Sequence, residues 1–248
     1  MERWKIVRLD YLFSVIIPCL IAIYISGNDL LVHLKTMAGW AFLGIAGNVI
    51  NDAIDKDRDL GWHVKELIAI SLGSILLAML CFVDLFVENP VNIMWICLAI
   101  ALVLLYCVKF KKHAITSTIV QVTPEIMFPF FTIYMPVNFV DWCWLISLLL
   151  FGYLSQLTHE AIDGEAITKF SKRQVQAIII LFSILTLASG VILFALTLDW
   201  NIVPFALVPL ATIYIFRAPR DHTARNIKDV GIILGNFFMI YFTILLLA

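Results

Sequence analysis

Charged residues are scarce in this chain. Asp, Glu, Lys and Arg together make up 14% of its 248 residues, whereas 62% are hydrophobic and the mean hydropathy is +0.98. Soluble domains carry about a quarter charged residues, so this composition excludes a water-soluble globule of this length. We therefore expect an integral membrane protein. The formal net charge of −1 carries no information about partners.

Cysteine pairs and linkers are also lacking, and we expect no cleavable leader. The five cysteines lie singly, without Cys-x-x-Cys spacing, which argues against a metal site or a disulfide framework. No linker, low-complexity tract or soluble domain interrupts the sequence, so we predict one domain over residues 1–248. The first apolar stretch lacks a small-residue cleavage pattern, and we expect it to remain as the first span. The cysteines are Cys19, Cys81, Cys97, Cys107 and Cys143.

Apolar segments of roughly bilayer-spanning length recur along the chain. They predict nine transmembrane helices in one all-α bundle. The predicted helices cover residues 11–26, 30–50, 67–87, 92–108, 114–135, 143–159, 176–197, 202–216 and 230–247.

The basic residues fall on one side of these helices. If the amino terminus is cytoplasmic, 16 of the 17 Lys and Arg residues lie in cytoplasmic segments, and only Lys35 lies opposite. Because cytoplasmic loops carry an excess of Lys and Arg, we expect the amino terminus on the cytoplasmic side of the membrane. The opposite loops carry the acidic residues Asp29, Asp84, Glu88, Asp141 and Asp199.

Four aspartates and two asparagines gather at the cytoplasmic end of the second predicted helix. At about 100° per residue, five of these six side chains share roughly one third of the helix circumference, and Asp57 falls on the far side. Crowded carboxylates repel unless a cation lies between them, and Mg²⁺ commonly bridges carboxylates to phosphate oxygens. The segment predicts a magnesium site and a phosphate-bearing substrate; the alternative is an acidic solvated loop. The five are Asn48, Asn51, Asp52, Asp55 and Asp59.

A second acidic segment, residues 159–165, ends the sixth predicted helix on the same side of the membrane. Its helical face carries Glu160 and Asp163 together with Gln156 and His159. Glu165 points away from this face unless Gly164 breaks the helix. Two acidic helix ends on one side of the membrane suggest one shared cavity.

The pattern Asn51-Asp52-x-x-Asp55-x-x-x-Asp59 at the end of the second of nine spans resembles the first aspartate-rich motif of the UbiA superfamily of intramembrane prenyltransferases. The second motif of that family lies at the end of the sixth span, where Glu160 and Asp163 stand. The segment Tyr106 to Lys112 is similar to the Tyr and Lys cluster of the family that contacts the diphosphate. The opening Arg8-Leu9-Asp10-Tyr11, with Pro18 in the first span, also resembles the family.

This resemblance implies nine helices around a central cavity open to the cytoplasmic side, with magnesium ions that bind the diphosphate of an isoprenoid donor. Carried over residue by residue, it implies metal ligation by Asn51, Asp52, Asp55, Asp59, Glu160 and Asp163. It further implies substrate binding by Asn51, Tyr106, Lys109, Lys111 and Arg8. Three features depart from the family pattern. The stretch with Arg and Pro that usually follows the first motif is replaced by residues 60–65, where only Lys65 could supply the positive charge. Ile167 replaces the last acid of the second motif, and residues 113–117 replace a small-residue turn.

Glu125 is the one acid that the sequence places deep in a predicted span, after Pro124 and beside Gln121 and Thr123. An ionisable residue inside the membrane is a functional candidate by default. Glu125 would orient an acceptor hydroxyl or stabilise a late cation; equally well, it would be a protonated side chain bonded to a neighbouring helix. We group it with Asp52, Asp55 and Lys109 as the expected catalytic residues.

Three functions are compatible with these patterns. The first is a magnesium-dependent prenyltransferase that ionises an allylic isoprenoid diphosphate and transfers the prenyl group to a lipophilic acceptor with an aromatic or lipid hydroxyl group. The second is a terpene cyclase of UbiA type that uses the same donor without an acceptor. The third is a cation-coupled transporter, which is disfavoured because the acids cluster at helix ends rather than at the midplane. We expect membrane lipids as partners and no nucleic acid.

Overall fold

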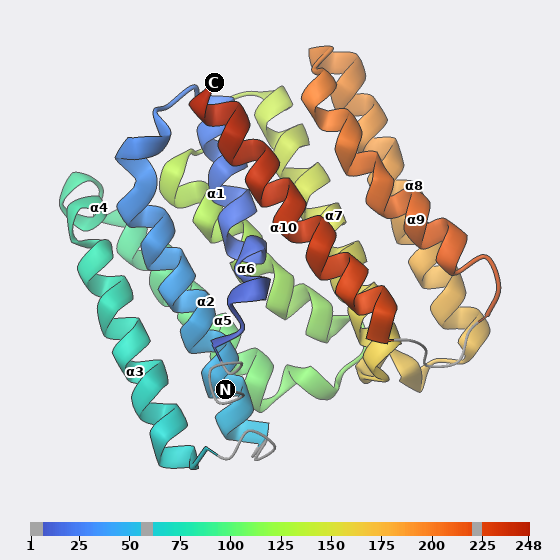
Figure 1. Ribbon diagram of the computed structural model, residues 1–248, viewed down its shortest axis with the longest axis horizontal. Coiled ribbons are helices and arrows are strands. Elements are labelled where there is room, and N and C mark those ends of the chain that lie inside the picture. Colours follow the sequence, from blue (N-terminus) through green and yellow to red (C-terminus); the bar gives the residue numbers. More distant parts are fainter. Residues whose placement is uncertain (1–6, 56–61, 220–224) are drawn as a thin grey trace. The chain divides into compact units, whose positions relative to one another are not determined.

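The computed structural model describes residues 7–55, 62–219 and 225–248, and within these ranges all regular structure is helical (Figure 1). The α-helices are α1 (Phe13–Ser26), α2 (Leu34–Asp55), α3 (Val64–Cys81), α4 (Val83–Glu88), α5 (Val91–Val108), α6 (Thr116–Ile133), α7 (Phe139–Asp163), α8 (Lys172–Thr197), α9 (Leu207–Ile215) and α10 (Arg225–Leu247). Short 3-10 turns η2 (Leu9–Tyr11), η3 (Leu30–His33), η4 (Phe110–Lys112), η5 (Ala166–Lys169) and η6 (Trp200–Ala206) join or precede them. The predicted all-α class is confirmed.

Seven helical segments of the described chain are long and apolar enough to cross a membrane. They match seven of the nine predicted spans, and the protein is an integral, multi-pass membrane protein. The two other predicted segments are also helical but fall short in different ways. α6 is a continuous helix, but its apolar sequence is broken by Gln121, Pro124, Glu125 and Pro129. The segment Trp200–Ile215 belongs to the shorter apolar helices. The count of nine spans and the cavity open to the cytoplasm stay predictions.

The helices divide into two compact units, each built from separate stretches of the chain. Unit 1 contains residues 1–109, 124–135 and 235–248, and unit 2 contains residues 110–123 and 136–234. The single domain over residues 1–248 therefore stays a prediction.

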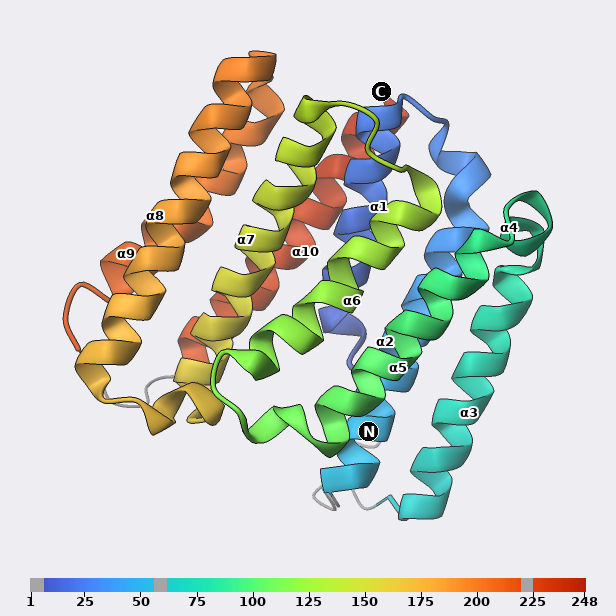
Figure 2. The ribbon, with the colours of Figure 1, turned by 180° about the vertical axis from the view of Figure 1, so that it is seen from behind.

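Helix α2 is the centre of unit 1, where it packs against α1, α3 and α5 (Figures 1 and 2). The contact is close because small residues face the neighbouring helices. A Cβ atom on Gly39 would lie 2.5 Å from the Phe82 ring, so glycine is required there. Near its other end, α2 is fixed by a buried cluster in which Val49 and Ala53 pack against Leu67 of α3. This cluster holds the last turn of α2 in place.

Lys35, the one basic residue on the side expected to be non-cytoplasmic, has a compensating partner in unit 1. Its Nζ atom lies 2.6 Å from Asp84 Oδ2. The ion pair neutralises the charge that departs from the bias of the other basic residues.

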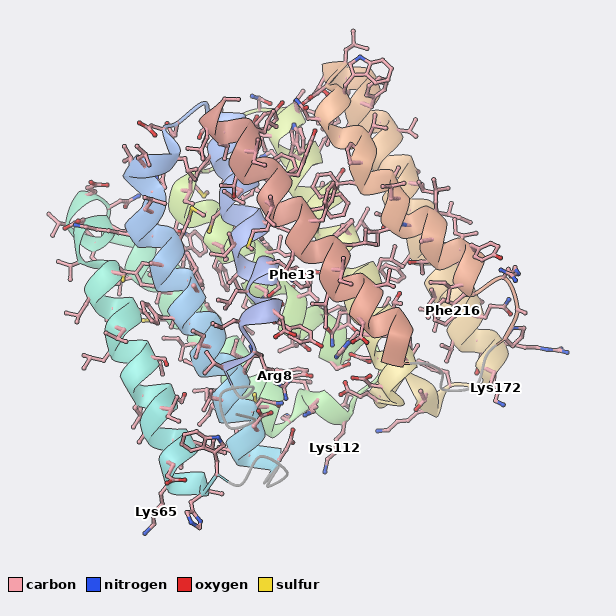
Figure 3. The ribbon with its side chains drawn as sticks, in the orientation of Figure 1. Arg8, Phe13, Lys65, Lys112, Lys172 and Phe216 are labelled. Carbon is pink, nitrogen blue, oxygen red and sulfur yellow. The ribbon has the colours of Figure 1, made fainter. Side chains whose placement is uncertain are left out.

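Helices α7, α8 and α9 form the body of unit 2. Their common core contains Leu154, Ile167, Ile179 and Phe216, the last of which is labelled in Figure 3. Gly164 ends α7 in the left-handed region with φ of 76°, a conformation that glycine adopts without steric cost. The acidic end of α7 is thus fixed by a glycine stop and by the packing of the turn that follows it.

Candidate functional site

The predicted acids of the first motif lie at the C-terminal end of α2. Asp52 and Asp55 occupy its last turn, which contains no basic residue. The C-terminal end of a helix carries the negative end of its dipole, so a carboxylate there is destabilised unless a cation lies nearby. We call Asn51, Asp52 and Asp55 the α2 acidic cluster. Asp59 lies outside the described residues.

Asp52 forms an ion pair with Arg8. The Nη2 atom of Arg8 donates a hydrogen bond of 2.7 Å to Oδ1 of Asp52, and the two residues are 44 positions apart in the sequence. Asp52 is 4% exposed, whereas the Arg8 side chain is 39% exposed. Arg8 has a left-handed backbone with φ of 45°, which is uncommon for a residue with a Cβ atom. Figure 3 shows Arg8 close to the C-terminal half of α2. The sequence predicted both residues for the site, and the structure joins them.

Other predicted residues of unit 1 differ in their exposure. Asp55 is exposed, Asn51 is partly buried and Lys109, just after α5, is exposed. Tyr106, on the last turn of α5, is buried. Glu125 lies within α6 and is partly buried. Thus the α2 acidic cluster combines one buried, paired carboxylate with one that faces the surroundings.

The second motif forms a separate cluster at the C-terminal end of α7, in unit 2. Glu160 and Asp163 stand in the last turn of this helix, again without a basic residue there. We call these two residues the α7 acidic cluster. His159 Nε2 lies 3.3 Å from Asp163 Oδ2, one helical turn apart. The carboxylates are again placed at the unfavourable end of a helix dipole.

Glu160 is held by hydroxyl groups instead of by a cation. Ser117 Oγ and Thr118 Oγ1 donate hydrogen bonds of 2.8 Å and 3.0 Å to the same oxygen, Glu160 Oε1. Both donors lie in the first turn of α6, and all three side chains are buried, with Glu160 1% exposed. The first turn of a helix is the positive end of its dipole, which favours a carboxylate there.

The other oxygen of Glu160 is unsatisfied. Within the described residues, Oε2 is buried and has no hydrogen-bond partner. A buried carboxylate oxygen without a partner is costly, because it has left water and gained nothing in return. Of the two oxygens of Glu160, one is therefore satisfied by hydroxyl groups and the other is not, within the described residues.

The end of α7 fixes the position of Glu165, which the sequence left open, and of Ile167. Gly164 ends the helix, so Glu165 lies beyond it, at the start of η5. Ile167, which replaces the last acid of the family motif, is fully buried in the core of unit 2 with Leu157 and Ile179. This position faces the hydrophobic core, where an acid would be unpaired.

Lys111 and Lys112 lie in the η4 turn of unit 2. The Lys169 ammonium group donates to the backbone carbonyl of Lys112, and Figure 3 shows Lys112 and Lys172 projecting from the end of unit 2 where α7 ends. Of the predicted Tyr and Lys cluster, Tyr106 and Lys109 belong to unit 1 and Lys111 belongs to unit 2.

The donor set suits magnesium better than a soft metal. Carboxylate and amide oxygens are the groups that Mg²⁺ takes, with water or phosphate oxygens completing its six positions. In the described part of the chain, no three His, Cys, Asp or Glu residues form a group that could hold a metal ion by itself. A metal ion at either cluster would need further oxygens, from water or from a bound ligand.

Ser117 and Thr118 are the site residues that the sequence does not reveal. They lie 43 and 42 positions from Glu160, and nothing in the local pattern distinguishes them from an ordinary helix start. The available signal is the departure of residues 113–117 from the family pattern, which placed hydroxyl and imidazole groups where small residues are usual.

Comparison with known proteins gives one informative similarity. A solved structure described as a UbiA homolog from Archaeoglobus fulgidus bound to GPP and Mg²⁺ matches this structure with a TM-score of 0.74. The match covers 100% of both chains, at 12% sequence identity. This chain has a UbiA-type fold. No protein-family model matches the sequence, and no curated protein matches it either. The predicted resemblance is confirmed at the level of the fold.

Proposed function

We propose that this protein is a magnesium-dependent intramembrane prenyltransferase. It would ionise an allylic isoprenoid diphosphate and transfer the prenyl group to a lipophilic acceptor with an aromatic or lipid hydroxyl group. One observation carries the proposal: in a chain with the UbiA-type fold, two acidic clusters end α2 and α7, each at the helix end that disfavours carboxylates. Residues placed against local stability mark functional sites.

The solved UbiA homolog with this fold binds GPP and Mg²⁺, and the oxygen donors of both clusters suit the same cation. Magnesium would neutralise the phosphate oxygens of the departing diphosphate. The proposed ligands are Asn51, Asp52, Asp55, Asp59, Glu160 and Asp163.

The basic residues have a complementary role in this proposal. Arg8, Lys109 and Lys111 would donate charge-assisted hydrogen bonds to the phosphate oxygens, and Tyr106 would donate its phenolic hydrogen. Arg8 would do so by exchanging its bond to Asp52 for a bond to phosphate when a metal ion takes over the carboxylate. Such preorganised donors stabilise negative charge as it develops on the leaving group.

Glu125 would accept a hydrogen bond from the acceptor hydroxyl and orient its oxygen toward the allylic carbon. Burial of the reacting groups in the bilayer would exclude water, which otherwise captures the allylic cation. We further propose that the amino terminus and the acidic clusters lie on the cytoplasmic side. Fusions of a reporter active only in the cytoplasm to residues near Asn89 and near Lys112 test this: only the second should be active.

A terpene cyclase is the second candidate. One observation favours it: the last acid of the second motif is replaced by Ile167, whose side chain belongs to the hydrophobic core. The α7 acidic cluster thus lacks one acid of the family pattern, and a changed acid set favours a changed fate of the allylic cation, which a cyclase captures within the same molecule.

The deciding experiment incubates the purified protein in lipid nanodiscs with allylic diphosphates of several chain lengths, with and without Mg²⁺ and a membrane extract. We expect pyrophosphate release only with Mg²⁺, and a product whose mass includes the acceptor. A product formed from donor alone would identify a cyclase. Absence of pyrophosphate release with every donor, together with cation flux in liposomes, would contradict both enzymes and favour a transporter.

A further inference from the structure

We propose that Ser117 and Thr118 determine the metal preference of the α7 acidic cluster. They would do so by restricting Glu160 to a single ligating oxygen, which favours Mg²⁺ over Ca²⁺. The inference rests on the proposed function, because it assumes that Glu160 binds a metal ion there.

The geometry of the hydroxyl groups supports the restriction. A carboxylate oxygen has two lone pairs, and both hydroxyl groups donate to Glu160 Oε1, at 2.8 Å and 3.0 Å. That oxygen is therefore saturated. Oε2 is buried and has no hydrogen-bond partner in the part of the chain that the structure describes. Any cation at Glu160 then meets one oxygen rather than two.

The backbone before α6 presents the two hydroxyl groups to Glu160. Ile115 has a left-handed backbone with φ of 67°, which is a strained conformation for a β-branched residue. The turn is closed by hydrogen bonds from Thr116 N to the carbonyl of Ala114, at 2.8 Å, and from Ser117 N to the carbonyl of His113, at 2.9 Å. The helix therefore begins so that two consecutive hydroxyl side chains, at 117 and 118, meet the same carboxylate.

The coordination chemistry of the two cations connects this geometry to metal choice. Ca²⁺ takes six to eight oxygens and often binds a carboxylate through both of them, whereas Mg²⁺ requires near-octahedral geometry with single oxygens. A glutamate with one oxygen saturated suits Mg²⁺. If the hydroxyl groups are removed, Oε1 becomes available, and Glu160 could bind a larger ion through both oxygens.

The test measures metal binding directly, with inorganic pyrophosphate in place of a reactive donor. Isothermal titration calorimetry in nanodiscs gives the affinities for Mg²⁺ and for Ca²⁺, each in the presence of pyrophosphate. For S117A/T118V we expect the ratio of Mg²⁺ to Ca²⁺ affinity to fall about tenfold, as for other residues that orient a metal ligand. The swapped variant S117T/T118S keeps two hydroxyl groups and should keep the ratio of the unmodified protein.

A matched control removes the same atoms elsewhere. In S183A/T212V, each lost hydroxyl group donates to a carbonyl of its own helix, at 2.8 Å, and both residues are buried. This variant should keep the metal preference. An unchanged ratio in S117A/T118V would overturn the inference while leaving the proposed function intact.

The variant Glu160→Gln tests whether Glu160 is a metal ligand at all. We expect it to lose Mg²⁺ affinity in the presence of pyrophosphate, because the amide is a poorer ligand than the carboxylate. Undiminished Mg²⁺ binding by Glu160→Gln would overturn the inference, since Glu160 would then not be a ligand. If the unmodified protein binds no Mg²⁺ with pyrophosphate, the proposed function fails, and this inference fails with it.

Discussion

The two acidic clusters end similar helices but stabilise their buried acids in opposite ways. At the end of α2, Asp52 is paired with the guanidinium group of Arg8, so the pair has no net charge. At the end of α7, Glu160 accepts hydrogen bonds from two neutral hydroxyl groups through one oxygen, and its other oxygen has no hydrogen-bond partner among the described residues. The first acid thus has a cationic partner, whereas the second has only neutral donors among the contacts described.

A third acid shows what a purely structural role looks like. Asp141 lies in the first turn of α7, at the favourable end of the helix dipole. Its Oδ2 accepts hydrogen bonds from the backbone amides of Val137 and Asn138, at 3.0 Å and 3.3 Å. Asp141 and Glu160 belong to one helix, and only Asp141 follows the rules for helix stability. The contrast supports a functional interpretation of the acids at the C-terminal end.

The largest expected effect concerns the boundary of the α7 acidic cluster. Replacing Ile167 with Asp should not extend the site, because position 167 belongs to the hydrophobic core. We expect a loss of at least about 3 kcal/mol in the free energy of unfolding, from an unpaired buried carboxylate. Ile167→Val, which keeps the core apolar, should cost only about 1 kcal/mol. Unfolding in detergent checks both; a stable Ile167→Asp protein with tighter Mg²⁺ binding would place residue 167 in the site.

Asp52→Asn tests the α2 acidic cluster by activity. The variant removes a proposed magnesium ligand, and we expect pyrophosphate release to fall at least about a hundredfold. Asp84→Asn is the matched control, because it removes an aspartate from an ion pair at the other end of α2. It should keep full activity. Equal activity of the two variants would show that Asp52 is not part of the site.

Arg8→Ala tests the charge compensation that distinguishes the two clusters. Asp52 would remain buried without its guanidinium partner, and we expect a loss of about 1–3 kcal/mol in the free energy of unfolding, reduced by the exposure of Arg8. Added Mg²⁺ should stabilise this variant more than the unmodified protein, because the cation can replace the lost charge. Thermal unfolding with and without Mg²⁺ measures both effects. An Arg8→Ala protein of unchanged stability would contradict the pairing.

Sequence patterns predicted the helices well because hydropathy is a local property. All nine predicted segments are helical in the described chain, and the motif at Asn51, Asp52 and Asp55 led to the UbiA-type fold. The hydrogen bonds that join each acidic cluster to distant residues could not be predicted. Arg8 and Asp52 are 44 positions apart, and Ser117 and Glu160 are 43 apart. Such contacts depend on how helices pack, which no periodicity in a single segment reveals.

Helix α6 shows a second limit of prediction from hydropathy. The segment 114–135 is predicted to span the membrane from its apolar residues, yet α6 carries Gln121, Glu125 and two prolines. A polar helix of this kind is tolerated in a membrane when its polar groups face protein rather than lipid. Hydropathy does not distinguish these environments.

The central claim is that the acids at the ends of α2 and α7 bind magnesium together with a diphosphate, and calorimetry tests it most directly. Mg²⁺ binding in the presence of pyrophosphate would be measured for Asp55→Asn, Asp163→Asn and the variant with both changes. We expect each single change to weaken Mg²⁺ binding strongly, because each removes a proposed carboxylate ligand, and the double change to weaken it at least as much as either alone. Undiminished Mg²⁺ binding by either single variant would contradict the account.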